Sequence, residues 1–416
     1  MNSKEKYSKI SLIHKHSNIP DVWWNDCIIY ELPFPSSESD LQLFAKSCHD
    51  LVQLGINAIL IRPSKIDFNN SKDFIKDFID IFHRVGLKVI MQLSGPSHVN
   101  DNTEKFSSPY IGFEISSTEV LNRAKTAIEN GVDGIDLGLI LEENMRSQTT
   151  IDSVRFNRLM TRLKKIISCS NKQILISATT SNQRENIEYH IKNNFIDMLR
   201  TDNFVHAPFS AKAFLNKIRE VYEVSDSINY PYSWHYQIHD SLNKNYPNST
   251  SWSKTSDNIK NRISSLQLLF LALPGSTYID YYDELSLDTL WKSKPFCQTY
   301  EHAQLIFSDQ KSMQYSPWKS YKKALLVRTQ HNMGLGTLAN IEGFPWANDD
   351  TLVLVCEHIY VITNMSSEQI IIPNDFELLV ASRTSLEKQY HENNDSYKKQ
   401  ETILPPETTA WFIRKE

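Results

Sequence analysis

The feature that most constrains the fold is a repeated unit in which an amphipathic helix ends at a glycine and a short apolar strand follows. The first copy reads DLQLFAKSCHDLVQLGINAILIRP, and the unit occupies residues 40–63, 72–93 and 117–137. In each copy the helical spacing of apolar residues ends at a glycine that suits the left-handed position just past a helix: Gly55, Gly86 and Gly131. This order predicts parallel strands joined by helical crossovers.

Further strands bring the predicted total to the number found in a closed barrel. Besides the strands of the three units, near 58–61, 89–93 and within 131–139, short apolar runs occur at 27–31, 174–177, 198–201, 232–236 and 277–281. About eight parallel strands alternating with helices indicate a (β/α)₈ TIM barrel. The alternative is an open doubly wound sheet. That fold normally has a glycine-rich phosphate turn after its first strand, which IIYELPFPSS lacks.

The pattern changes near residue 341, which divides the chain into regions. Beyond it, strand-like runs such as DTLVLVCEHIYVITNM and TTAWFIRKE follow one another without helices, as in an antiparallel β domain. We therefore predict a polar, flexible lead-in over 1–20, a barrel over 21–340 whose last helix lies within 320–339, and a small C-terminal β-sandwich over 341–416.

Composition excludes several classes of protein. The chain has 416 residues, 40% of them hydrophobic, and a net charge of −5 without a dense Lys/Arg cluster, so we expect no nucleic-acid groove. The longest apolar run, 266–273, is too short to span a membrane, and no signal peptide is evident. The five cysteines lack metal-ligand spacing and are interpreted mostly as buried hydrophobes. We predict neither a metal site nor a cofactor.

Candidate catalytic residues should follow the carboxyl ends of the barrel strands. No charged group directly follows the fifth strand in ISATTSNQ, and Asp136 on the fourth strand needs a partner that the sequence does not identify. The charged groups at the remaining strand ends are Glu142 after the fourth, Asp202 after the sixth, His239 and Asp240 after the seventh, and Asp283 and Glu284 after the eighth. We interpret Asp283 and Glu284 as capping the loop after the last strand.

Several blocks, in order, resemble the signature regions of the alpha-amylase-type glycoside hydrolases, family thirteen. They are VWWNDCIIYEL, LVQLGINAILIRP, RVGLKVIMQL, GVDGIDLG and LALPGSTYIDYYDEL. The resemblance implies the same barrel and a C-terminal β-sandwich. It also implies that the catalytic set is degenerate. The family's nucleophilic Asp falls on Gly138, its general-acid Glu on or near Ala178, and its strand-four Arg on Asp136.

Other family positions are also altered. The strand-three Asp matches Gln92, the Asn-His after it matches Pro96 and Ser97, and only the strand-seven pair is kept, at His239 and Asp240. Retaining glycoside hydrolysis needs two opposed carboxyl groups about 5–5.5 Å apart. The sequence therefore predicts a protein that is not an enzyme.

Within the family, the chain resembles the heavy-chain subunits of heteromeric amino-acid transporters, of the leukocyte surface-antigen type. Only about twenty residues follow Leu93 before the next helix, so the separate B domain of active relatives is absent, and Trp23-Trp24 matches the entry into that barrel. The resemblance implies the ectodomain of a type II membrane glycoprotein that partners a multi-span light chain at the plasma membrane. The membrane span is expected outside this chain. The family's interchain cysteine has no counterpart before Cys27, which we expect to be buried.

The sequence also contains candidate glycosylation sites and is compatible with two other functions. Sequons occur at Asn69, Asn248, Asn364 and Asn394. Of these, Asn69, Asn248 and Asn394 are assigned to polar loops, whereas Asn364 follows a strand. One alternative function is an α-glucosidase with displaced carboxylates, such as Glu142 and Asp240. The other is a carbohydrate-binding barrel whose mouth would expose Trp234, Tyr236 and Tyr282, for which packing in the barrel wall is the competing interpretation.

Overall fold

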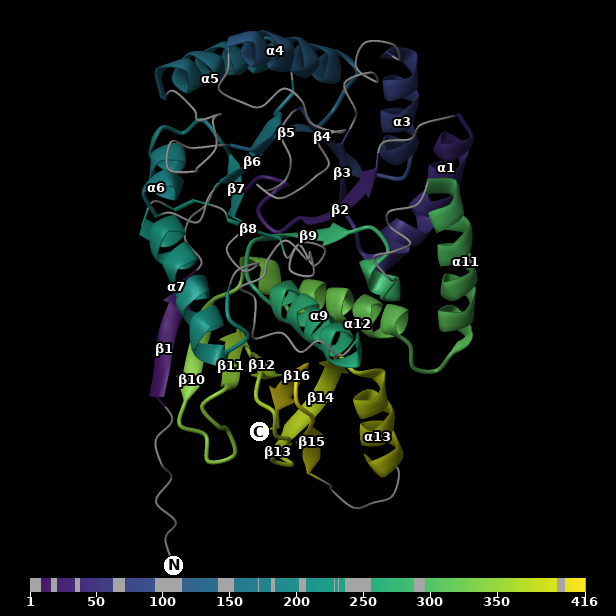
Figure 1. The fold of residues 1–416 in the computed structure, drawn as a ribbon, viewed down its shortest axis with the longest axis vertical. Coiled ribbons are helices and arrows are strands. Elements are labelled where there is room, and N and C mark those ends of the chain that lie inside the picture. The colour runs from purple at the N-terminus through teal and green to yellow at the C-terminus, as the bar shows by residue number, and fades with distance from the viewer. Residues whose placement is uncertain are drawn as a thin grey trace, which may run out of the picture.

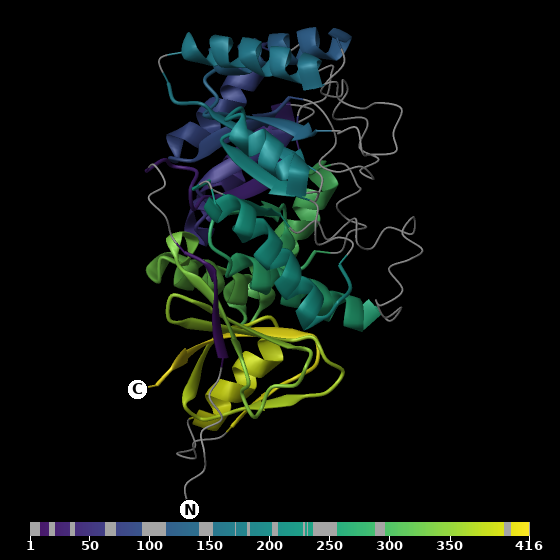
Figure 2. The ribbon, with the colours of Figure 1, turned by 90° about the vertical axis from the view of Figure 1, so that its left-hand side faces the viewer.

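The centre of the computed structural model is a closed barrel of parallel strands (Figures 1 and 2). The structure describes residues 9–15, 21–33, 38–62, 72–93, 114–140, 153–170, 172–180, 184–201, 207–227, 229–230, 232–235, 256–287, 296–394 and 401–415. The barrel strands are β2 (Ile28–Pro33), β3 (Ala58–Arg62), β4 (Lys88–Gln92), β5 (Gly134–Leu139), β6 (Leu175–Thr180), β7 (Met198–Thr201), β8 (Ser233–His235) and β9 (Ser276–Asp280).

Strand pairing confirms a closed barrel and excludes the open doubly wound sheet. The eight strands follow the order β7-β6-β5-β4-β3-β2-β9-β8, and all pairs are parallel. A parallel bridge between Leu199 and Tyr232 joins β7 to the residue before β8, and the Ser233 hydroxyl donates to the Leu199 carbonyl at 3.0 Å. These contacts close the ring.

Helices alternate with the strands and cover the outside of the barrel (Figure 1). They are α1 (Glu38–Leu54), α3 (Lys72–Arg84), α4 (Glu114–Glu129), α5 (Ser153–Ser168), α6 (Arg184–Lys192), α7 (Ala211–Ser227), α9 (Ser256–Leu271), α11 (Phe296–Ser312) and α12 (Pro317–Gln330). The glycines after α1, α3 and α4 have φ values of 101°, 85° and 97°, which confirms the predicted helix ends.

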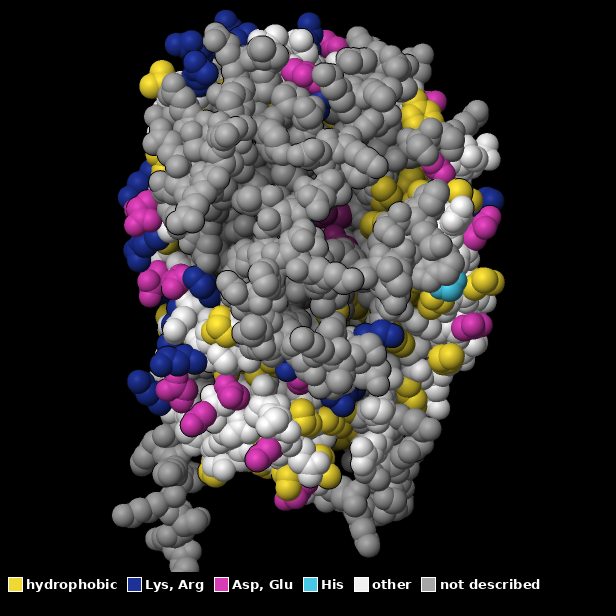
Figure 3. Space-filling view, viewed as in Figure 1, with side chains coloured by type: hydrophobic (Ala, Val, Ile, Leu, Met, Phe, Trp, Pro, Cys, Tyr) yellow, Lys and Arg dark blue, Asp and Glu magenta, His cyan; other side chains and the backbone are white. Residues whose placement is uncertain are grey.

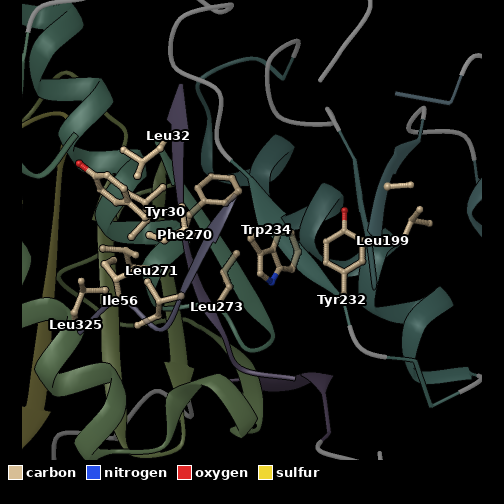
Figure 4. Packing of buried hydrophobic residues seen from close by; sticks show 14 of the residues in the cluster. Tyr30, Leu32, Ile56, Leu199, Tyr232, Trp234, Phe270, Leu271, Leu273 and Leu325 are labelled. Atoms are coloured by element: carbon tan, nitrogen blue, oxygen red, sulfur yellow. The ribbon is translucent and has the colours of Figure 1, made fainter. Parts of the chain in front are cut away.

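Successive side chains of each barrel strand point alternately outward and inward, which gives one apolar core between barrel and helices and another inside the barrel. Outward-facing side chains such as Tyr30 and Leu199 pack against the helices in the larger core, of which Figure 4 shows a part. A smaller cluster fills the barrel interior and includes Ile29, Met198 and Tyr278. This alternation determines which polar residues face the barrel axis.

The C-terminal domain is antiparallel, as predicted, but it also contains a helix. Its main sheet follows the order β1-β10-β11-β12-β16-β14, and β13 pairs with β15. The elements are β10 (Leu338–Glu342), β11 (Thr351–Cys356), β12 (Ile359–Asn364), β13 (Ile370–Ile372), β14 (Phe376–Ala381), α13 (Thr384–Asn394), β15 (Thr402–Leu404) and β16 (Thr408–Arg414). Because β10 begins at Leu338, this domain starts slightly before the predicted boundary at 341.

The prediction of a flexible lead-in over 1–20 is wrong for its described part, 9–15. β1 (Lys9–His14) pairs antiparallel with β10 and is the edge strand of the C-terminal sheet. The His14 ring contacts the Asp226 carboxylate of α7 at 2.6 Å and stacks on Tyr222. The segment therefore joins the sheet to the barrel helices, and its partner strand lies too far along the chain for local pattern to reveal it.

Barrel and C-terminal domain share a continuous interface. The buried Trp411 indole donates to the Leu268 carbonyl at 3.2 Å, and Arg262 forms an ion pair with Glu407 at 2.6 Å. None of the described helices is both long and apolar enough to cross a bilayer.

The cysteines follow the expectation only in part. Cys27, Cys48 and Cys356 are buried, as predicted, whereas Cys169 and Cys297 are exposed, and all five are free thiols.

Candidate functional site

The charged side chains of the barrel interior come from the carboxyl-terminal halves of the strands. Along β2, β5, β7 and β9 the outward residues Tyr30, Ile135, Leu199 and Ile279 belong to the outer core. Their neighbours face the axis. The inward charged groups are Glu31 on β2, Asp136 on β5, Arg200 on β7, His235 on β8 and Asp280 on β9. They form two groupings of different character.

The first grouping is a fully buried ion pair between Asp136 and Arg200. Arg200 Nη1 lies 2.5 Å from Asp136 Oδ2, and Nη2 lies 3.2 Å from Oδ1. Both side chains have no solvent exposure. The Ser177 hydroxyl donates to Oδ2 at 2.6 Å, and the Gly138 amide donates to Oδ1 at 2.8 Å. Arg200 is therefore the partner that Asp136 required.

Each member of this pair stabilises the charge of the other. Burial alone would raise the pKa of Asp136, but the Arg200 charge and the hydrogen bonds from Arg200, Ser177 and Gly138 outweigh it and lower that pKa. Burial would lower the pKa of Arg200, yet attraction to Asp136 raises it instead. The guanidinium also lies over the Tyr278 ring, 4.4 Å from the centroid. Asp136 is thus an ionised structural group with its oxygens occupied.

Gly138, at the position matched to the family's nucleophile, has a conformation unsuited to other residues. Its φ is +68°, in the left-handed region that L side chains rarely adopt. The pairing of β5 with β6 is irregular between Asp136 and Leu139. The backbone, as well as the side chain, therefore departs from what a carboxylate-bearing residue would need here.

The residue matched to the general acid, Ala178, faces the helices rather than the barrel axis. Ala178 is buried in the outer core, so its side chain points away from the axis. The inward neighbours on β6 are Ser177, which contacts Asp136, and Thr179. None of the residues of β6 carries a carboxyl group, so the inference that this strand provides no general acid is unchanged.

The second grouping brings two carboxylates and an imidazole together. His235 Nε2 lies 3.4 Å from Glu31 Oε1 and 3.7 Å from Asp280 Oδ1. The three ligand atoms all lie within 4.8 Å of one another. The side chains are 5% exposed for His235, 6% for Glu31 and 13% for Asp280. Figure 3 shows acidic side chains in a hollow near the middle of the face that it views.

Sequence reasoning missed this grouping because it searched only the residues beyond the strand ends. Glu31, His235 and Asp280 lie within strands, two positions after the inward residues Ile29, Ser233 and Tyr278. Successive side chains of a strand point to opposite faces. Applied to IIYEL, SWH and STYID, this rule would have predicted that all three side chains point into the barrel. Only the barrel's closure places β8 and β9 beside β2.

Asp283 and Glu284 lie outside the barrel mouth. They form the 3₁₀ helix η1 (Asp283–Leu285), which has no side-chain cap. Both oxygens of Glu284 accept from the Tyr30 hydroxyl at 3.1 Å. The expectation that these residues cap the loop stays a prediction, and the contact with Tyr30 shows that Glu284 anchors the turn to β2.

The aromatic candidates that the structure describes pack in the barrel wall. Trp234 is 1% exposed and donates to the Pro274 carbonyl at 2.7 Å. Its ring contacts Tyr222, Tyr232 and Phe270, and Figure 4 shows it together with Tyr232 and Phe270. Tyr282 is 8% exposed. Neither offers a surface on which a sugar ring could stack.

Two of the four sequons can be placed. Asn364 is fully buried, and its amide nitrogen donates to the carbonyls of Glu368, Leu404 and Pro405. A glycan on this nitrogen is incompatible with the fold, so Asn364 is withdrawn as a candidate. Asn394 ends helix α13 rather than lying in a loop.

Other predicted positions lie outside the described residues. They are Asn69, Pro96, Ser97, Glu142, Asp202, Tyr236, His239, Asp240 and Asn248.

Comparison with solved structures shows which fold this is. A trehalose-6-phosphate hydrolase from Bacillus licheniformis is 13% identical, with a TM-score of 0.60, and the match covers 95% of this chain and 100% of that one. Amy13B from Eubacterium rectale is 15% identical, with a TM-score of 0.60 and coverage of 94% and 96%. The fold is that of the alpha-amylase-type hydrolases.

A third structure of similar likeness is AmyP in complex with maltotriose, 12% identical over 94% of this chain and 98% of that chain, with a TM-score of 0.58. No family model matches the chain, and no curated protein matches it. At these identities the likeness establishes the barrel and the C-terminal β domain, and it leaves function to the residues.

Proposed function

We propose that this chain is a non-catalytic, amylase-type barrel that acts as the extracellular part of a transporter heavy chain. In this role it associates with a multi-span amino-acid transporter light chain and supports the surface expression and stability of that partner at the plasma membrane. The partner and the location rest on the sequence resemblance to transporter heavy chains.

One observation carries the non-catalytic part of the proposal. At the end of β5, the position that the resemblance matches to the nucleophile is Gly138, with a φ of +68°, and the nearby carboxylate of Asp136 is bound by Arg200, Ser177 and the Gly138 amide. Nucleophilic attack at an anomeric carbon needs a carboxylate oxygen that is free to form a bond. The oxygens of Asp136 are already occupied in a buried ion pair.

A two-part experiment tests the proposal. The purified chain is assayed against aryl α-glucosides and maltotriose, and we expect no turnover above the buffer blank. The chain, joined to a membrane span, is then co-expressed with amino-acid transporter light chains from the same source. We expect it to co-purify with one of them and to raise its surface level, whereas glucoside turnover or the absence of any light-chain complex would contradict the proposal.

A second candidate, a hydrolase with displaced carboxylates, is favoured by the second grouping. The ligand oxygens of Glu31 and Asp280 lie within 4.8 Å of each other, close to the separation of about 5–5.5 Å between the carboxyl groups of retaining glycosidases. In this version Glu31 and Asp280 replace Glu142 and Asp240 as the reacting pair. Glucoside turnover that is lost in Glu31→Gln and Asp280→Asn, or in Asp240→Asn, would establish it.

A further inference from the structure

We infer that Glu31, His235 and Asp280 form a binding site for a divalent cation of the zinc class. The three residues come from β2, β8 and β9, which are neighbours in the closed barrel. Their ligand atoms all lie within 4.8 Å of one another. The inference goes beyond the proposed function and does not depend on it.

The His235 side chain provides an observation independent of the two carboxylates. It is 5% exposed, and its Nε2 atom is buried without a hydrogen-bond partner. The nearest acidic oxygens, on Glu31 and Asp280, lie 3.4 and 3.7 Å away. Leaving a polar nitrogen buried without a hydrogen bond destabilises the fold. A cation between the three side chains would remove that destabilisation.

The distances agree with ligands around one small cation. Zinc lies 2.0–2.1 Å from nitrogen and about 2.0–2.2 Å from oxygen in tetrahedral sites, which separates neighbouring ligand atoms by about 3.4 Å. A charge-assisted hydrogen bond between imidazolium and carboxylate would instead be about 2.7–2.9 Å long. The observed 3.4 and 3.7 Å are nearer the first value.

The ligand atoms of the cluster, one imidazole nitrogen and carboxylate oxygens, indicate which class of cation would bind. Imidazole nitrogen suits zinc and its transition-metal neighbours, whereas calcium and magnesium prefer oxygen ligands alone. One histidine with two carboxylates also balances the charge of a divalent ion.

The test measures Zn²⁺ binding by calorimetry and by competition with a chromophoric chelator. An exposed histidine pair, His331 and His358, lies with ring nitrogens 2.6 Å apart, so the full chain carries His358→Asn in every sample. We expect one Zn²⁺ per chain and a rise in melting temperature with added Zn²⁺. Mg²⁺ and Ca²⁺ should bind more weakly than Zn²⁺.

Substitutions assign the binding to the cluster. His235→Gln and Asp280→Asn should each weaken Zn²⁺ binding at least about tenfold, whereas the matched control His190→Gln, at a histidine buried on α6, should leave it unchanged. Circular dichroism establishes that each variant is folded, and Asp280→Asn serves if His235→Gln is not. X-ray absorption should find nitrogen and oxygen ligands at about 2.0–2.2 Å.

Two results would overturn the inference. One is the absence of stoichiometric Zn²⁺ binding at millimolar concentration. The other is binding whose affinity is the same in the cluster variants as in the His190→Gln control.

Discussion

Two charged groupings share one barrel interior and differ in geometry. Asp136 and Arg200 form a bidentate pair with no exposure, and a serine and a backbone amide also donate to the carboxylate. Glu31 and Asp280 instead share one histidine, whose Nε2 lies 3.4 and 3.7 Å from their oxygens. The first grouping has the character of a structural element, because a close pair neutralises buried charge, and the second has the mixed nitrogen and oxygen donors of a binding site.

The largest expected effect follows from breaking the matched pair. Arg200→Met should destabilise the protein by about 3–5 kcal/mol, because it leaves the Asp136 charge buried and unpaired. Urea denaturation measures the change. The double variant Asp136→Leu/Arg200→Met should recover most of the loss, and Arg158→Met on the exposed side of α5 should change stability by less than about 0.5 kcal/mol. Equal losses in the single and double variants would show that the charge pairing is not what matters.

A smaller effect is expected from placing a carboxylate at the nucleophile position. Gly138→Asp should cost about 1–3 kcal/mol, because its φ of +68° is unfavourable for aspartate. It should bring no glucoside turnover. Gly86→Asp, at a glycine with a φ of +85° and open space around it, is the control for backbone strain alone. Hydrolysis gained by Gly138→Asp would mean that the barrel mouth is still competent for catalysis.

The second grouping should respond in the opposite direction. In the presence of a chelator, Asp280→Asn should stabilise the protein by about 0.5–1 kcal/mol, because it removes one of two neighbouring negative charges at a site that is not optimised for stability. Thermal and urea unfolding with and without chelator measure this. A loss comparable to that of Arg200→Met would show that the two groupings do not differ as described.

The smallest expected effect is on how the free energy of unfolding changes with pH in acid, not on its value at neutral pH. The pKa of Asp136 is lowered in the folded state, so the unfolded chain binds more protons in acid. The stabilisation from Asp136 is therefore present above its unfolded pKa of about 3.9 and is lost as pH falls through the folded value. The free energy of unfolding of Asp136→Leu/Arg200→Met, measured between pH 6 and 2, should fall less steeply than that of the wild type. An identical slope would contradict the pKa assignment.

The barrel could be predicted from sequence because its signals are local. Helical periodicity, a glycine at the helix end and an apolar strand are each read within about twenty residues, and Met198–Thr201 was predicted with its observed bounds. Helix α13 and the outward orientation of Ala178 were not predicted. The first lies among strand-like runs, and the second depends on which face of β6 points inward.

The candidate site was predicted only in part. The resemblance to amylases pointed to Asp136 and Gly138 on β5 but not to Glu31 and Asp280, which lie within other strands. No sequence pattern joins Asp136 to Arg200, which is 64 positions away.

The sequence by itself determined the repeating helix–strand unit and the parallel barrel, because these depend on residue type and short-range periodicity. Tertiary structure decided that Arg200 neutralises Asp136 and that Glu31, His235 and Asp280 meet. It also decided that Lys9–His14 completes a sheet with residues from the other end of the chain. The physical reason is that strand closure and charge pairing are long-range, so they appear only when the chain is folded.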